Sequence, residues 1–130
     1  MKKIDNFVNC LNVLKKADFD NANVDEIYRT GIIGQFNLTF ELAWKALQEV
    51  LRLHDVEGAE SGSPREILQL ANKVNFLDSD AVWLSMLKTR NLSVHLYNEE
   101  EAVEMIGKIK DEYIEAFEKL VKVLNDKLEN

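Results

Sequence analysis

Residues 35–45, QFNLTFELAWK, decide the fold of this chain. Phe36, Phe40 and Trp44 follow one another at intervals of four, which places them on one side of an α-helix. A ladder of large aromatic side chains at this spacing is typical of a packing stripe, and less often of a ligand platform. The stripe continues in both directions, through Ile27, Ile33, Leu47 and Leu51. The pattern therefore predicts one long helix over about residues 24–54.

Two glycines, Gly31 and Gly34, fall inside this helix, where each costs roughly 1 kcal/mol relative to alanine. One explanation is a tolerated weak point. The other is close approach of a second backbone, for example at a contact between subunits, and the sequence leaves both open. Asn23 is a candidate N-cap for the helix, because Glu26 three residues later completes a capping box.

Four further segments show apolar residues at helical spacing. They cover about residues 2–17, 64–74, 80–96 and 99–127. Ser63, Pro64 and Glu66 form a second capping box with proline at the first helical position. No segment alternates with a period of two, so strands are not expected. The sequence predicts an all-α fold, a single domain over residues 1–130, and an antiparallel four-helix bundle with one extra short helix.

The composition excludes several classes of protein. With 130 residues, 46% of them hydrophobic and 30% charged, the chain suits one packed domain. Its net charge of −7 disfavours nonspecific binding to nucleic acid, because no excess of basic side chains displaces counterions. The single cysteine, Cys10, fits a reducing cytoplasm. No run reaches the ~18 apolar residues of a membrane span, and we expect no membrane association.

Residues 90–97, RNLSVHLY, carry the most chemistry. The Arg90 guanidinium offers a planar fork of donors to a phosphate, and His95 can transfer a proton near neutral pH. An Arg and a His five positions apart form a weak signal when taken alone, because an exposed pair on a helix has the same spacing. With Asn91 and Tyr97, they predict a small site for a phosphodiester or a nucleotide.

A helical projection of residues 80–96 tests this site. With Leu84 at zero, Asn91 falls at about 340°, His95 at about 20° and Arg90 at about 240°. Asn91 then lies near the centre of the apolar stripe, where an amide needs partners or a cleft. Arg90 and His95 are about 140° apart, so one straight helix does not aim both at one phosphate. Either the helix unwinds near Leu96, or a twofold dimer joins two copies, and we favour the dimer.

Glu41 lies beside the aromatic ladder. It is either solvated or a partly buried carboxylate that orients Arg90 or Arg65. Tyr97 is either an amphipathic surface residue, a ligand contact or a hydroxyl open to modification. Metal binding is poorly supported, because the sequence has no cluster of cysteine and histidine and no paired-carboxylate spacing.

Four blocks, taken in order, resemble the nucleotidyltransferase substrate-binding protein family, which belongs to the HEPN superfamily. They are residues 35–45 (QFNLTFELAWK), 63–66 (SPRE), 83–87 (WLSML) and 90–97 (RNLSVHLY). The resemblance covers nearly the whole chain. It implies a helical bundle that forms a homodimer, and a separate minimal nucleotidyltransferase as partner. The catalytic carboxylates, the Mg²⁺ and the nucleoside triphosphate then belong to the partner, and this chain has no cofactor of its own.

The resemblance leaves open whether the chain is an enzyme. In the favoured interpretation it binds a nucleotide or substrate through Arg90, Asn91, His95 and Tyr97, with Glu41 and Arg65 nearby. In related HEPN toxins the same motif is a metal-independent ribonuclease. His95 would then act on the ribose 2′-hydroxyl or the leaving oxygen, and Arg90 would stabilise charge on the phosphate. Asn91 would orient the phosphate or His95, with RNA as a possible ligand. In some such pairs the partner silences the toxin by adding AMP to the tyrosine two residues after the histidine, a place that Tyr97 occupies here. A plain helical interaction module is the third alternative.

Overall fold

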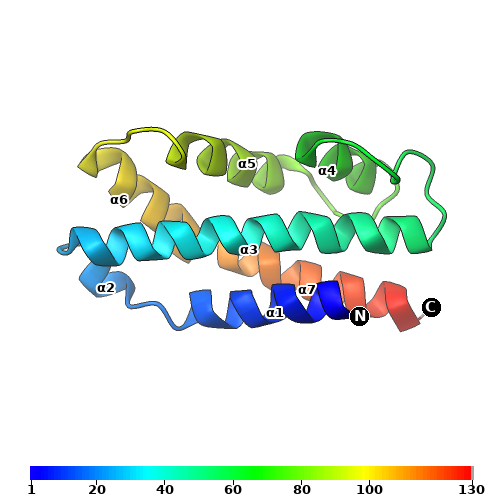
Figure 1. Cartoon of the computed structure of the whole chain (residues 1–130), viewed down its shortest axis with the longest axis horizontal. Coiled ribbons are helices and arrows are strands. Elements are labelled where there is room, and N and C mark those ends of the chain that lie inside the picture. The colour runs from blue at the N-terminus through cyan, green and yellow to red at the C-terminus, as the bar shows by residue number, and fades with distance from the viewer. Residues whose placement is uncertain (130) are drawn as a thin grey trace.

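The computed structural model describes residues 1–129, and almost all of its regular structure is helical (Figure 1). No strand occurs among these residues, so the all-α prediction is confirmed. The elements are α1 (Lys2–Lys15), α2 (Phe19–Ala22), α3 (Glu26–Leu53), α4 (Pro64–Lys73), α5 (Ala81–Ser93), α6 (Glu99–Lys108), the π-helical segment η1 (Ile109–Tyr113) and α7 (Ile114–Glu129). Within this range no helix has the length and apolar composition needed to cross a membrane.

The helices pack side by side as a bundle of four segments, in which each segment runs antiparallel to the one before it (Figure 1). The long helix α3 runs through the centre, and α1 packs alongside it in the opposite direction. Helices α4 and α5 follow one another along α3, so together they make one layer. The run from α6 through η1 to α7 makes the fourth. The predicted extra short helix, α4, is thus part of a layer of the bundle.

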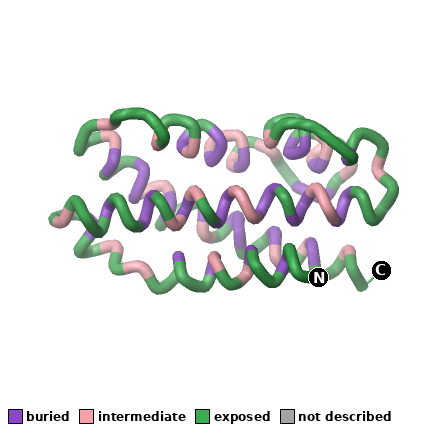
Figure 2. Tube along the Cα trace, viewed as in Figure 1, coloured by how far each residue is buried: buried purple, intermediate pink, exposed green. Residues whose placement is uncertain are grey.

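The aromatic ladder of α3 lies in the core, as the sequence predicts. Phe36, Phe40 and Trp44 are buried, and Figure 2 shows that buried positions recur along the length of α3. Phe36 stacks on Tyr113 with ring centroids 5.2 Å apart. Phe117 meets Trp83 edge-on at 5.6 Å. Such pairs contribute about 0.5–1.5 kcal/mol each beyond the burial of their area, and they join α3, α5 and the last helix into one core.

Local signals set most helix boundaries. The Ser63 capping box is present as predicted, with the Glu66 amide donating to Ser63 Oγ over 3.2 Å. The cap of α3 was predicted wrongly: Asp25, not Asn23, accepts the Ile27 amide at 2.8 Å. Two elements were missed entirely. The first is α2, which Asp18 caps, and the second is the π-helical segment η1.

Helix α5 is shorter than the predicted range of residues 80–96. It ends at Ser93, whose hydroxyl donates to the Arg90 carbonyl at 2.8 Å. A hydroxyl that satisfies a carbonyl of the last turn removes part of the drive to continue the helix. Asn98 and Glu101 then form a capping box that begins α6. His95 and Tyr97 therefore lie in the connection between two helices.

A buried polar cluster in the bundle is centred on Tyr113 in η1. Its side chain is fully buried, and its hydroxyl lies 2.7 Å from Ser85 Oγ and 2.9 Å from Thr89 Oγ1. These hydrogen bonds join η1 to α5 and satisfy Thr89, which is itself buried. This buried polar cluster therefore holds α5, the helix that carries Arg90, in place against η1.

The outward side of α3 departs from the predicted stripe. Ile27, predicted to face the core, is 82% exposed. Gly31 and Gly34 are exposed too, and nothing lies within 4 Å of a Cβ built at either position. Within one protomer, then, no second backbone approaches these glycines. The prediction of a subunit contact there is not tested by a single chain.

Candidate functional site

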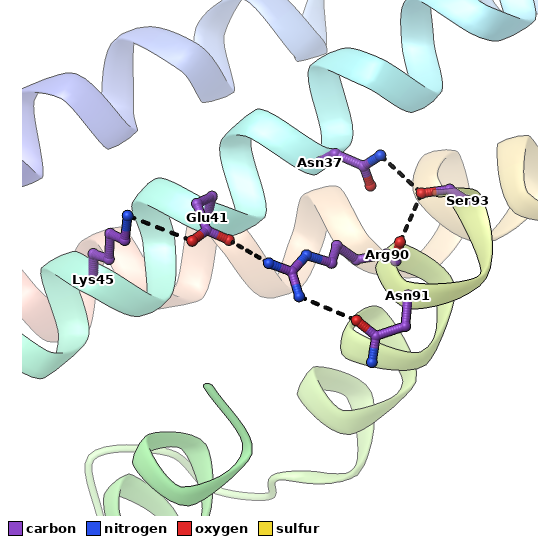
Figure 3. A network of polar contacts seen from close by, with 6 residues as sticks. All are labelled: Asn37, Glu41, Lys45, Arg90, Asn91 and Ser93. Atoms are coloured by element: carbon purple, nitrogen blue, oxygen red, sulfur yellow. Dashed lines mark hydrogen bonds and ion pairs between the residues drawn. The ribbon is translucent and has the colours of Figure 1, made fainter. Parts of the chain in front are cut away.

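Arg90 is held between α5 and α3 by an ion pair with Glu41 (Figure 3). Its Nη2 atom donates to Glu41 Oε2 over 3.1 Å, and both side chains are about one third exposed. Lys45, one turn further along α3, lies 3.4 Å from the other Glu41 oxygen. Of the two partners considered for Glu41, the structure selects Arg90, since Arg65 lies exposed at the start of α4 with no polar partner among residues 1–129.

A second set of contacts fixes the backbone beneath Arg90. Asn37 Nδ2 donates to Ser93 Oγ at 2.8 Å, and Ser93 Oγ donates to the Arg90 carbonyl (Figure 3). On the solvent side, Arg90 Nη1 donates to Asn91 Oδ1 at 3.1 Å. The Asn37 Oδ1 atom is buried without a hydrogen-bond partner. Arg90 is therefore pre-oriented by α3 while part of its guanidinium remains accessible to a ligand.

The predicted position of Asn91 at the centre of the packing seam is wrong, because Asn91 is exposed. The buried residues of α5 are Trp83, Met86, Leu87 and Thr89. On the same projection they span about 140–300°, so the inward direction lies close to Arg90 and not to Asn91. The seam was misplaced because Thr89 is polar and yet buried, through its bond to Tyr113.

His95 and Tyr97 lie in a groove at the other end of the site, where α3 begins and α6 begins. The groove has a volume of about 370 Å³. Glu26, Arg29 and Thr30 of α3 line one side of it, and Asn98, Glu99 and Ala102 line another. His95 is exposed and Tyr97 is half-buried. Within residues 1–129 no group of three His, Cys, Asp or Glu side chains is placed to hold a metal ion.

Arg90 and His95 are not brought together in one protomer. Arg90 contacts α3 at Glu41, whereas His95 shares its groove with Arg29. Twelve residues separate these two positions of α3, which is about 18 Å along the helix. Among the described residues no hydrogen bond links Arg90 with His95. Because α5 ends at Ser93, the helical projection no longer fixes the direction of His95. Even so, Arg90 and His95 do not point toward one common phosphate position within a protomer.

Sequence reasoning missed Arg29. Arg29 is buried, with only 6% of the residue exposed, and it lies in the groove with His95. A signal was available, because Arg29 precedes Ile33 by four residues and so falls on the stripe of Phe36 and Phe40. A single charge on an otherwise apolar stripe indicates either a buried ion pair or a binding group.

The fold and site together define an all-α bundle with a polar site along one helix and no metal-ligand cluster of its own in residues 1–129. A family described as nucleotidyltransferase substrate binding protein like matches residues 2–126, and the chain belongs to that family. Membership implies a nucleotidyltransferase as partner.

Two solved structures are similar over nearly the whole chain. A protein from Thermus thermophilus is 34% identical, with a TM-score of 0.75, and the match covers 91% of this chain and 98% of that one. A protein from Haemophilus influenzae, described as having the fold of a substrate binding domain of a nucleotidyltransferase, is 21% identical, with a TM-score of 0.77. That match covers 94% of this chain and 98% of the other. A search of curated proteins gives no match.

Proposed function

We propose that this chain is the substrate- or nucleotide-binding subunit of a two-component nucleotidyltransferase and pairs with a separate catalytic subunit. The observation that carries the proposal is the Arg90 arrangement. Glu41 and Asn91 hold the guanidinium at 3.1 Å each, and it remains one third exposed. A pre-oriented arginine with accessible donors suits a phosphate or carboxylate of a bound ligand.

In this proposal the chemistry of transfer belongs to the partner. Nucleotidyl transfer is a phosphoryl-transfer reaction, and such reactions use a divalent metal held by carboxylates. Residues 1–129 place no group of three such side chains together. We assign the Mg²⁺ and the nucleoside triphosphate to the catalytic subunit, as the resemblance to the family implies. This chain contributes binding and orientation of the ligand.

We further propose that the subunit is a homodimer, and that its copies meet on the outward side of α3. Ile27, Gly31, Gly34 and Leu38 follow one another at intervals of four, three and four, and all four are exposed. Glycines in such a row let two helices approach closely. Leu38→Glu should lower the association constant measured by sedimentation equilibrium. Leu53→Glu, at a similarly exposed position outside the row, is the matched control.

The test of the main proposal is reconstitution with the nucleotidyltransferase partner. The two proteins should co-elute in size-exclusion chromatography, and nucleotide transfer should need both. Arg90→Gln should leave the complex intact and reduce transfer at least tenfold. Lys88→Gln removes the same charge from an exposed position on α5 and should have little effect. Absence of a complex with the wild-type chain would refute the proposal.

The ribonuclease alternative has less support from the geometry. Its two principal groups, Arg90 and His95, lie in different surroundings within one protomer. Incubation of the wild-type chain with mixed-sequence RNA in EDTA, beside His95→Ala, tests this activity directly. Cleavage that disappears in the mutant would establish a ribonuclease. The mass of Tyr97-containing peptides, with and without the partner and ATP, would then test modification by AMP.

A further inference from the structure

Arg29 is the one charged side chain that is buried in the described part of the chain. A buried charge is costly unless it is paired and hydrogen-bonded. A guanidinium carries five N–H donors, so a fully satisfied arginine needs several acceptors. The partners of Arg29 therefore show what this position is built for.

Arg29 has one firm partner and one loose one. Nη1 donates to the Ala22 carbonyl at 3.0 Å, which anchors the side chain to the end of α2. Nη2 lies 3.5 Å from Glu99 Oε1, too far for a strong charge-assisted hydrogen bond. The Glu99 side chain is 76% exposed, whereas that of Arg29 is 8% exposed. The arginine is thus fixed, and its carboxylate partner is free to move into solvent.

The open side of Arg29 faces the groove. None of its nitrogen atoms is both buried and unpartnered, so the donors that lack a protein partner reach solvent there. His95 and Tyr97 bring an imidazole and a phenol hydroxyl to the same groove. The volume of about 370 Å³ falls within the range of roughly 300–1,000 Å³ that is common for small-molecule sites. The space therefore admits a ligand larger than a simple ion.

We propose that this groove binds the phosphate of a nucleoside monophosphate on Arg29, and that the phosphate displaces the Glu99 carboxylate. The displaced carboxylate turns into solvent, so one anion replaces another on a preformed cation. His95 and Tyr97 contact the same phosphate, and Glu26 accepts hydrogen bonds from ligand hydroxyls. The proposal refines the binding role proposed above by naming a phosphate subsite distinct from Arg90.

Competition with Glu99 gives the proposal a clear signature. Glu99→Gln removes the competing charge and should tighten binding of AMP about two- to fivefold, the range expected from a weak exposed ion pair. Glu100→Gln is the matched control, because Glu100 is exposed on the next residue and does not line the groove. It should leave the affinity within about 1.5-fold of the wild type, since solvent and salt screen charges outside a direct contact.

The experiment is calorimetric titration of the full-length chain with AMP, repeated with inorganic phosphate. Tighter binding of AMP than of phosphate supports a nucleotide site, and equal affinities would overturn the nucleotide assignment. Arg29→Lys keeps the charge, loses the fork of donors and should weaken AMP binding about tenfold. If that variant does not fold, the Glu99 and Glu100 pair still decides. Equal effects of those two variants, or no AMP binding by the wild type, would overturn the proposal.

Failure here is distinguishable from failure of the proposed subunit role. Complex formation and nucleotide transfer are measured with the partner present, whereas AMP binding is measured on the isolated chain, where Lys88→Gln, at an exposed position of α5 outside the groove, should have no effect. If the chain forms the transferase complex but binds no AMP, only the proposed phosphate subsite is refuted. If the chain binds AMP through Arg29 but forms no complex with a partner, the subsite stands and the proposed subunit role is refuted.

Discussion

Tyr113→Phe is the most direct test of how the bundle holds the helix that carries Arg90. The change removes one hydroxyl and leaves the ring, which still stacks on Phe36 at 5.2 Å. Two hydrogen bonds disappear, to Ser85 and to Thr89. Each is worth about 0.5–1.5 kcal/mol net, and Thr89 is left buried with an unsatisfied hydroxyl. We expect the free energy of unfolding to fall by about 1–3 kcal/mol.

This loss translates into a measurable change in melting temperature. An unfolding entropy of about 2.1 cal/mol/K per residue gives about 0.27 kcal/mol/K for a chain of this length. The melting temperature should therefore fall by about 4–11 °C. Urea denaturation followed by far-UV circular dichroism measures the free energy, and calorimetry measures the melting temperature.

The control for this prediction is Tyr28→Phe, which removes the same atom from a half-exposed side chain on α3. Its stability should stay within about 0.5 kcal/mol of the wild type. Thr89→Val should cost less in the Tyr113→Phe background than alone, because its partner is already gone. If Tyr113→Phe is as stable as Tyr28→Phe, the buried polar cluster around Tyr113 does not stabilise the bundle as expected.

Four further changes test local features of the fold by the same denaturation measurements. Ser63→Ala should cost about 1 kcal/mol, because it removes the cap of α4. Hydrogen bonds from the Ser63 amide and hydroxyl lower the pKa of the Glu66 carboxyl below its ordinary 4.5. The ionised carboxylate therefore stabilises the fold above pH 4.5, and this contribution disappears as the pH falls through the lowered pKa. Glu66→Gln should flatten this part of the profile of stability against pH. Asp55→Gly should stabilise the chain by up to about 1 kcal/mol, because Asp55 has a positive φ of 55° just after α3, and a destabilised variant would contradict this. Gly34→Ala should stabilise the isolated protomer by about 0.5–1 kcal/mol, because the added Cβ meets open space; weaker dimerisation in the same variant would place the glycine in the subunit contact.

Features with a local cause were predictable from the sequence. The spacing of Phe36, Phe40 and Trp44 defines a helix and its buried side without reference to the rest of the chain. The Ser63 capping box is equally local, since all its atoms lie within four residues. Helical spacing in all five predicted segments, with no strand pattern and short connections, was sufficient for the all-α antiparallel bundle.

Features that depend on distant partners were not predictable. Thr89 is buried because the Tyr113 hydroxyl reaches it from another helix, and this misplaced the seam of α5 and with it Asn91. Arg29 is buried because the Ala22 carbonyl and the Glu99 carboxylate meet it from two other elements. In the candidate site, the pairing of Glu41 with Arg90 was one of several alternatives, and only the fold selected it.

The length of α3 has a practical consequence for studying this protein. The helix has 28 residues and is about 42 Å long. The groove lies where α3 begins, whereas the start of α1 and the end of α7 lie near the opposite end of the bundle (Figure 1). A fluorescent protein or a surface tether joined to either end would therefore sit far from the groove. Energy transfer from such a label to a labelled catalytic subunit would report which end of the bundle the subunit approaches, without obstructing the approach itself.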